Sequence, residues 1–388
     1  MSSPVLGLQP SVLRWARESS GLSIPDVARS LKCDPLEISE WEAGVSGPTY
    51  AQLEHLAYSL YKRPLAVFFL PAPPTEPNLK QEFRTLPDTE IEQLSADTRY
   101  QLRLGRLFQL SLRELNDGVN PTPRKIFHDC AIFDTADVLH AASAIRDYLR
   151  ITLADQFSWK SNEQGLMAWR NAVEEAGVFV FKRAFKQKTI SGFCLIDEEF
   201  PLIYLNNNTA KTRQIFSLFH ELAHLLLRVS AISMLDESYV EHLPQAEKHL
   251  EQYCNALAAE ILIPSDDFSG QIAAVRRVSD ESVERLADRY HVSREAILRK
   301  LLDRGLVEQA YYETKAKQWA QEAKEQTGSG GHYYATQATY LGQNYIRLVL
   351  GKHYQGKLSL EQVADYLGIR TKSVAGLEAH ILRKAVPA

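Results

Sequence analysis

Two histidines and a glutamate inside one strongly apolar helix constrain this chain more than any other feature of its sequence. Residues 216–227 read FSLFHELAHLLL, in which His220 and His224 lie four positions apart. In a helix this spacing places both imidazoles on one face, one turn apart, with Glu221 beside them. Burying these three polar groups without partners is costly, and one metal ion would satisfy all of them. The stretch therefore predicts a buried helix that carries a metal site.

The alternative interpretation is a core helix whose two histidines make ordinary hydrogen bonds. The chain contains 11 histidines. A His-Glu-x-x-His sequence is then expected by accident only on the order of a few times in a hundred such chains. The apolar context adds to the argument, because a core helix has little other use for two imidazoles.

A catalytic metal usually takes three protein ligands and keeps one position for water, so a third ligand must come from elsewhere. Residues 250–263, closed by Pro264, show helical spacing of apolar residues and predict a second core helix. Glu251 lies at its start, beside the apolar stripe, and is the predicted third ligand. Glu247 and Glu260 remain alternatives, and a structural carboxylate is another interpretation of Glu251.

These two stretches resemble the ImmA/IrrE family of zinc metallopeptidases. Members of that family carry a His-Glu-x-x-His helix, followed by a helix of the form Glu-x-x-Ala-Asn-x-Phe-Ala-Ala-Glu-Leu-Leu-Met-Pro, which residues 251–264 match here. The sequence departs from this pattern at Cys254, Leu257 and Ile263. All three changes concern packing and leave the metal-binding positions intact.

The resemblance implies the roles of the site residues. It makes His220, His224 and Glu251 the ligands of one Zn²⁺ ion per chain, and Glu221 the general base. Zinc lowers the pKa of its bound water and polarises a scissile carbonyl, while a base takes the proton of that water. Such a site hydrolyses a peptide bond.

The resemblance also implies a biological role. Family members cleave a repressor-type regulatory protein, so it implies a cytoplasmic regulatory endopeptidase with a helix-turn-helix repressor as its substrate. A second interpretation is a binding protein with a structural or vestigial metal site, either a DNA-binding transcriptional regulator or the antitoxin-like partner of a toxin. A third is a scaffold with three helix-turn-helix modules that binds DNA as a dimer, with its peptidase core idle. The presence of Glu221 favours the enzyme, because a structural site does not need this residue.

The order of sequence patterns predicts a mainly α protein with a small β-sheet (α+β). At 388 residues the chain is too long for one ordinary core. Proline-rich residues 71–77 and glycine-rich residues 327–331 break the pattern. We expect a helix-turn-helix domain resembling the XRE type (1–71), a proline-rich linker with a connecting helix (72–135), a compact zincin-like metallopeptidase domain with a second helix-turn-helix-like part (136–310), and a helical C-terminal module (311–388).

Three stretches before the metal helix have the period of strands, at residues 178–181, 190–196 and 202–205. The order of these elements resembles that of compact zinc peptidases, and this resemblance implies an edge strand beside the metal. We interpret Leu202, Ile203 and Tyr204 as such a strand, to which an extended substrate would bind through main-chain hydrogen bonds. An internal, fully paired strand fits the same residues equally well.

The helix-turn-helix pattern of residues 22–42 has an acidic second helix. Glu37, Glu40 and Glu42 would face phosphate if this helix entered a DNA groove. Docking to a protein or dimerisation is therefore favoured over DNA binding for this domain.

A second helix-turn-helix pattern follows at residues 283–302. It offers Arg294, Arg299 and Lys300 as candidate DNA contacts. A solvated charged helix face is the alternative interpretation.

The composition excludes some classes of protein. A formal net charge of -4 provides no general attraction to nucleic acid or to an anionic membrane. The densest apolar run, residues 65–70, is too short to span a bilayer, and residues 1–15 show no export signal. The chain has 4 cysteines, none close in sequence to another, so a reducing cytoplasm is the expected compartment.

Overall fold

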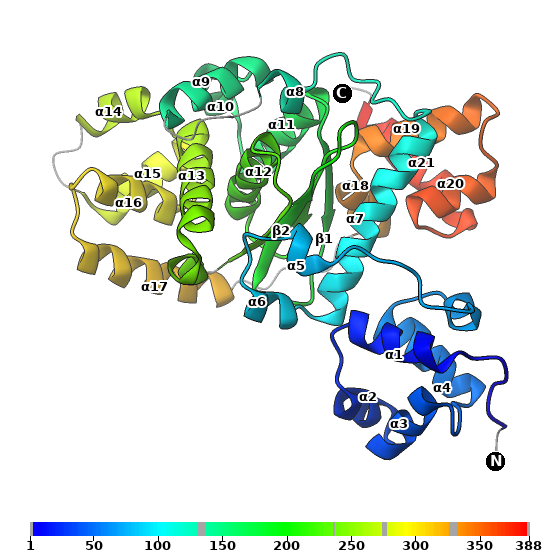
Figure 1. The fold of residues 1–388 in the computed structure, drawn as a ribbon. Coiled ribbons are helices and arrows are strands. Elements are labelled where there is room, and N and C mark those ends of the chain that lie inside the picture. Colours follow the sequence, from blue (N-terminus) through cyan, green and yellow to red (C-terminus); the bar gives the residue numbers. More distant parts are fainter. Residues whose placement is uncertain (1–2, 131–136, 236, 274–277, 326–331, 386–388) are drawn as a thin grey trace. The chain divides into compact units, whose positions relative to one another are not determined.

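The computed structural model describes residues 3–130, 137–235, 237–273, 278–325 and 332–385 (Figure 1). These residues form a mainly helical protein with one small mixed sheet, so the predicted fold class is confirmed. The chain divides into two compact units, Met1–Leu107 with Phe185–Lys188, and Phe108–Ala184 with Thr189–Ala388. The expected boundaries at residues 71, 135 and 310 are finer than this division and stay predictions.

The first unit consists of short helices whose ends follow from their capping residues. The side chain of Ser23 accepts a hydrogen bond from the backbone N–H of Asp26, and Gly44 ends a helix with a φ of 75°. The helices are α1 (Pro10–Ser19), α2 (Ile24–Leu31), α3 (Pro35–Ala43), α4 (Tyr50–Glu54), η1 (His55–Tyr61), η2 (Leu65–Phe69), α5 (Leu79–Glu82), α6 (Asp88–Glu92) and the first part of α7 (Ala96–Leu115).

The position of Glu42 in this unit corrects one expectation. Glu42 is only 6% exposed, and the guanidinium of Arg17 on α1 donates hydrogen bonds of 2.6 and 2.9 Å to its two carboxylate oxygens. The prediction that Glu42 faces phosphate is therefore wrong. This pair could not be predicted from the sequence, because its two residues lie on different helices, 25 positions apart.

The second unit is built around a four-stranded sheet with the order β1-β3-β2-β4. Its strands are β1 (Phe179–Arg183), β2 (Ile190–Leu195), β3 (Leu202–Asn206) and β4 (Ala231–Met234). β1 lies parallel to β3, whereas β2 is antiparallel to both β3 and β4. The three predicted strands are confirmed, and β4 was not predicted.

The sheet order corrects the predicted edge strand. Leu202, Ile203 and Tyr204 belong to β3, which pairs with β1 on one side and with β2 on the other. The edge-strand prediction is therefore wrong, and the internal alternative holds. The outer strands are β1 and β4. Because β4 follows the metal helix in the chain and returns to pair with β2, its place could not be read from the local pattern.

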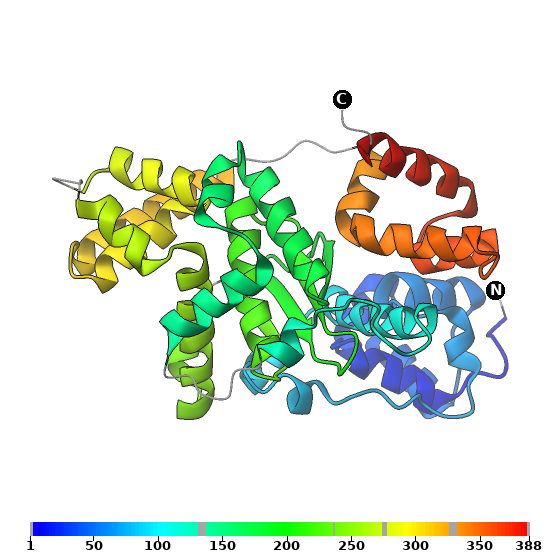
Figure 2. The same ribbon diagram turned by 90° about the horizontal axis from the view of Figure 1, so that it is seen from above.

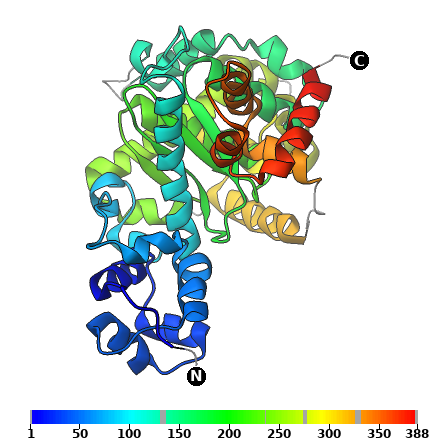
Figure 3. The same ribbon diagram turned by 90° about the vertical axis from the view of Figure 1, so that its right-hand side faces the viewer.

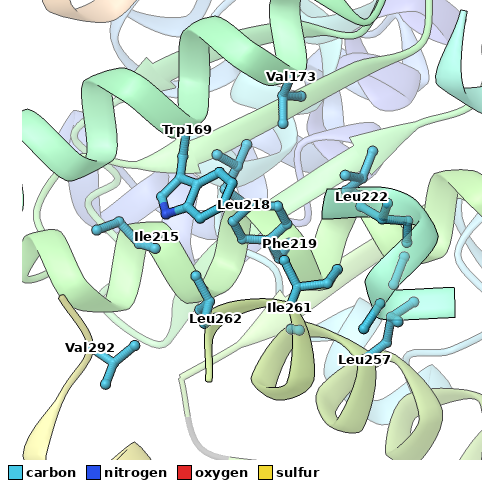
Figure 4. Packing of buried hydrophobic residues seen from close by; sticks show 14 of the residues in the cluster. Trp169, Val173, Ile215, Leu218, Phe219, Leu222, Leu257, Ile261, Leu262 and Val292 are labelled. Atoms are coloured by element: carbon cyan, nitrogen blue, oxygen red, sulfur yellow. The ribbon is translucent and has the colours of Figure 1, made fainter. Parts of the chain in front are cut away.

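Three long helices form the core beside this sheet, with the second of them packed against both of the others (Figure 4). They are α11 (Asn162–Glu175), α12 (Lys211–Leu226) and α13 (Gln245–Leu262), so both predicted core helices form. The ring of Trp169 on α11 meets Phe219 on α12 edge to face, with ring centroids 4.8 Å apart. Leu257 and Ile261 of α13 belong to the same buried cluster.

The remaining helices of the second unit lie outside this core. Figure 2 and Figure 3 show the last helices gathered into a separate bundle, coloured orange to red. In the described part of the chain, none of the helices has both the length and the apolar character needed to cross a membrane. The helices are α8 (Ile126–Asp129), α9 (Val138–Leu149), α10 (Leu153–Ser158), η3 (Glu237–His242), α14 (Ser265–Ala273), α15 (Asp280–Tyr290), α16 (Arg294–Asp303), α17 (Gln309–Glu325), α18 (Tyr333–Leu341), α19 (Gln343–Tyr354), α20 (Leu360–Leu367), η4 (Thr371–Ser373) and α21 (Val374–Ala385).

One buried lysine on β1 makes the stability of this unit depend on pH. Lys182 is 4% exposed. Burial, together with the charges of Arg170 and Lys211, lowers the pKa of Lys182 to about 6. The unfolded chain keeps this lysine protonated up to about pH 10.4, so the folded state binds fewer protons between these two values. The free energy of unfolding should therefore rise with pH across this window.

We expect Lys182→Met to raise the thermal midpoint of unfolding most near pH 6 and progressively less towards pH 10. The substitution removes a lysine that must give up its proton on folding, which costs on the order of a few kcal/mol near pH 6 and nothing once the unfolded chain also loses the proton. Differential scanning calorimetry at several pH values measures this, with the exposed Lys160→Met as the control. An equal rise of the thermal midpoint at every pH would contradict the lowered pKa of Lys182.

Candidate metal centre

Three donor groups from two adjacent helices converge in the core of the second unit. The Nε2 atoms of His220 and His224 on α12 lie 3.1 Å apart. From α13, the Oε2 atom of Glu251 lies 3.4 Å from Nε2 of His220, and its Oε1 atom lies 3.4 Å from Nε2 of His224. The structure thus brings together the three residues that the sequence proposed as metal ligands.

The site lies in the interior of the protein. Glu221 and His224 are fully buried, Glu251 is 1% exposed and His220 is 5% exposed. Polar groups at this depth require partners, because an unsatisfied buried carboxylate or imidazole costs several kcal/mol. Among the described residues, both oxygens of Glu221 and Oε1 of Glu251 lack a hydrogen-bond partner of good geometry.

These residues fit a metal ion, on the chemistry of the donor set. Two imidazole nitrogens and one carboxylate, with their ligand atoms within 4.8 Å of one another, are a donor set typical of catalytic zinc. Burial alone would raise the pKa of Glu251, but His224 and His220 more than offset it, so this pKa lies below its ordinary value. Glu251 is therefore ionised and ready to bind a cation.

Glu221 differs from Glu251 in its surroundings. Burial raises the pKa of Glu221 to about 7, although His220, Ser233 and Cys194 act in the opposite direction. A carboxylate with this pKa exchanges protons readily near neutral pH, which is the property required of a general base.

A glycine on β2 permits this arrangement. A Cβ atom at Gly192 would lie 2.8 Å from the carbonyl oxygen of Tyr204 and 3.5 Å from Oε1 of Glu221. The first distance is shorter than real contacts allow, so the strand can approach β3 and the glutamate only without a side chain here. Sequence reasoning missed this residue, because one glycine in a strand gives no signal of what lies behind it.

A small cavity of about 10 Å³ adjoins the metal-binding residues, which leaves room for about one water molecule. Part of its wall comes from β4, and part comes from η3, the segment that follows β4. The residues that line it are Ser191, Arg213, Phe216, Ser217, His220, Ser233, Met234, Tyr239 and Glu251.

Arg213 and Tyr239 line this cavity and were not predicted. Arg213 lies seven positions before His220 on the same helix, and its Nη2 atom donates a hydrogen bond of 3.1 Å to the carbonyl of Met234. Helical spacing could have identified Arg213, since residues seven apart share a face. Tyr239 lies in a polar connection whose sequence has no period, so nothing there indicated its place.

The structure does not bring the alternative ligands into the site. Glu260 accepts hydrogen bonds from the backbone N–H of Ser265 at 2.6 Å and from Nζ of Lys300 at 2.7 Å. Glu247 lies outside the group of possible metal ligands, as does Glu260. Of the three carboxylates on α13 that were considered, Glu251 is the one that reaches both histidines.

The three candidate DNA contacts on α16 have partners within the protein. Arg294 donates to Glu322 at 2.7 Å, and Arg299 pairs with Asp303 at 3.3 Å. The side chain of Lys300 is 11% exposed and also donates to the carbonyl of Ile263 at 2.5 Å. Lys300 thus joins α16 to the end of α13, and a DNA contact of Arg294 or Arg299 stays a prediction.

Part of the chain matches a known protein family. Residues 173–302 match the Peptidase_M78 family model, described as the IrrE N-terminal-like domain. This span contains all four strands, both metal-site helices and Glu221, and it supports a relationship of this region to the ImmA/IrrE peptidases. A search of curated proteins found no match. The helices of the first unit and the C-terminal bundle lie outside the matched span.

We expect purified wild-type protein to contain about one zinc ion per chain, and the His220→Ala, His224→Ala double variant to contain almost none. Removing both imidazoles leaves one carboxylate, which cannot hold zinc tightly. Elemental analysis after dialysis measures the metal content. Glu260→Gln is the matched control, because it changes a carboxylate on the same helix outside the site. Equal zinc in wild type and the double variant would contradict the site.

Proposed function

We propose that this protein is a zinc-dependent endopeptidase that cleaves a regulatory protein. The observation that carries the proposal is the buried group of His220, His224 and Glu251 with Glu221 beside it. The match of residues 173–302 to a peptidase family supports it. Zinc would be held by Nε2 of each histidine and by the carboxylate of Glu251.

Zinc, Glu221 and the apolar core would each have a different role in the hydrolysis. When bound, zinc polarises a scissile carbonyl and makes water a better nucleophile. Glu221 accepts the proton of the attacking water, which its pKa of about 7 allows at neutral pH, and then gives it to the leaving amine. The surrounding apolar core excludes other water and strengthens these electrostatic interactions.

The outer strand β4 is the proposed binding edge for an extended substrate. β4 pairs with β2 on one side only, and its residues Ser233 and Met234 line the metal cavity. A substrate that added a strand here would bring its main chain beside the metal ligands. β4 thus takes the substrate-binding role that the sequence predicted for β3, because both sides of β3 are already paired.

Substrate entry requires a movement of the segment that closes the cavity. A space of about 10 Å³ accommodates no peptide. The hydrogen bond from Arg213 to Met234 holds the end of β4, where this segment begins, and Tyr239 of the segment lines the cavity. The regulatory substrate would be a helix-turn-helix repressor, as the family resemblance implies, and its binding would open the segment.

Glu221→Gln should abolish cleavage while zinc content stays unchanged. The amide keeps the shape of the side chain but cannot accept a proton, and loss of a general base lowers kcat by about 10² to 10⁴-fold. Cleavage of candidate repressor proteins, followed by mass spectrometry, measures this against the control Glu260→Gln. Cleavage by Glu221→Gln at the wild-type rate would overturn the proposed role of Glu221.

Arg213→Met should speed the removal of zinc by a chelator such as dipicolinate about fivefold. Loss of one hydrogen bond worth about 1 kcal/mol shifts the opening of the segment by this factor. Stopped-flow absorbance with the cobalt-substituted protein measures the rate. The control is Arg228→Met, which removes an exposed arginine that pairs with Glu198 at 3.9 Å. Identical rates in all three proteins would show that the Arg213 contact does not keep the cavity closed.

A further inference from the structure

The C-terminal helices α18 and α19 contact the β1 edge of the sheet through a polar cluster. Arg170 on α11 donates one hydrogen bond of 2.8 Å to the carbonyl of Thr339 and another of 2.8 Å to Glu174. The amide of Asn344 donates to the other oxygen of Glu174 at 2.7 Å. Arg170 also donates to the carbonyl of Val180 on β1. One buried ion pair on α11 thus joins the sheet to the last helices.

An aromatic cluster makes the second connection. The ring of Phe181 on β1 stacks on Phe108 of α7, with centroids 4.0 Å apart. Tyr345 of α19 meets both rings edge to face, at 5.2 and 5.5 Å, and is 3% exposed. These contacts bury apolar area between the sheet and α19.

A cavity of about 480 Å³ lies where these two clusters meet. Its size is within the range of sites that bind small molecules, unlike the cavity of about 10 Å³ at the metal-binding residues. Most of its wall is apolar, with polar groups at a few places. The residues that line it are Pro121, Thr122, Pro123, Arg124, Glu174, Glu175, Phe179, Val180, Phe181, Leu341, Asn344, Tyr345 and Leu348.

The wall carries two carboxylates, Glu174 and Glu175, and one guanidinium, Arg124. Arg124 contacts Tyr148, which does not line the cavity: its guanidinium donates to the carbonyl of Tyr148 at 2.6 Å and lies over the Tyr148 ring at 5.1 Å. Glu174 is already bound by Arg170 and Asn344. Glu175 is exposed, and in the described part of the chain it has no ion-pair partner. The carboxylate available to a ligand is therefore that of Glu175, which lies next to Glu174 in the chain.

The apolar wall defines the rest of the ligand. Phe179, Phe181 and Tyr345 offer aromatic surface, which attracts organic cations as well as apolar groups. Leu341 and Leu348 add aliphatic surface from α18 and α19. A molecule with an apolar body and one ammonium group matches both parts of the wall.

We propose that this cavity is a binding site for a small organic cation, an aromatic or aliphatic amine whose ammonium group pairs with Glu175. Its apolar body lies between β1 and α19. Such a ligand touches residues of both clusters that hold α18 and α19 to the sheet, so its binding strengthens this attachment. The site requires no metal and is independent of the proposed peptidase chemistry.

Three probes of similar shape and different charge test the proposal on the full chain. Phenethylamine should bind with a Kd on the order of 1 mM, as expected for a fragment of about nine non-hydrogen atoms. Neutral phenethyl alcohol should bind about tenfold more weakly, and anionic phenylacetate should not bind measurably. Saturation-transfer NMR with titration measures all three, and phenethylamine should raise the thermal midpoint of unfolding.

Variants locate the binding. Glu175→Gln should weaken phenethylamine about tenfold, because it removes the exposed carboxylate without disturbing the core. Leu348→Trp should also weaken it, since the larger ring occupies part of the cavity. The control Glu163→Gln changes an exposed carboxylate on the same helix, away from the cavity, and should bind like wild type. The His220→Ala, His224→Ala double variant should also bind like wild type.

Three results would overturn the proposal. One is the absence of saturable phenethylamine binding up to about 20 mM, well above the expected Kd. Another is equal binding of phenylacetate, which would remove the argument from charge. The third is unchanged phenethylamine binding in both Glu175→Gln and Leu348→Trp, which would place the amine elsewhere. None of these results depends on whether the protein cleaves peptides.

Discussion

The rest of the structure depends on the convergence of two imidazoles and two carboxylates inside an apolar core. His220, His224, Glu221 and Glu251 are at most 5% exposed, and the helices that carry them pack directly on each other. Water cannot solvate these groups there, so they must satisfy one another or a metal. The apolar surroundings that make the arrangement costly also raise the pKa of Glu221 to about 7, which suits a general base.

Local periodicity explains which parts of this site the sequence could predict. The spacing of His220 and His224 fixes their common helix face, and the apolar stripe beside Glu251 fixes its direction relative to the core. The position of β4 could not be predicted, because strand pairing joins segments far apart in the chain. Arg17 and Glu42 illustrate the same limit. Glu42 looked like a surface carboxylate because the arginine that buries it lies on another helix.

The metal cavity and the larger cavity lie beside opposite edges of the same sheet. Ser233 and Met234 of β4 line the metal cavity, whereas residues of β1 line the larger one. With β3 and β2 between them, the two outer strands are separated by three strand spacings, about 14 Å. A ligand in the larger cavity therefore cannot touch the metal-binding residues. Any influence of one site on the other must pass through the core.

Helix α11 lines the larger cavity and also packs on α12, which carries the two histidines. Its last turn carries Glu174 at the larger cavity, and Trp169, five positions earlier, packs edge to face on Phe219, the neighbour of His220. Contact alone does not couple two sites, because coupling requires an element with two arrangements that both ligands bias. The segment held by Arg213 is such an element in the proposed mechanism, since a substrate requires it open.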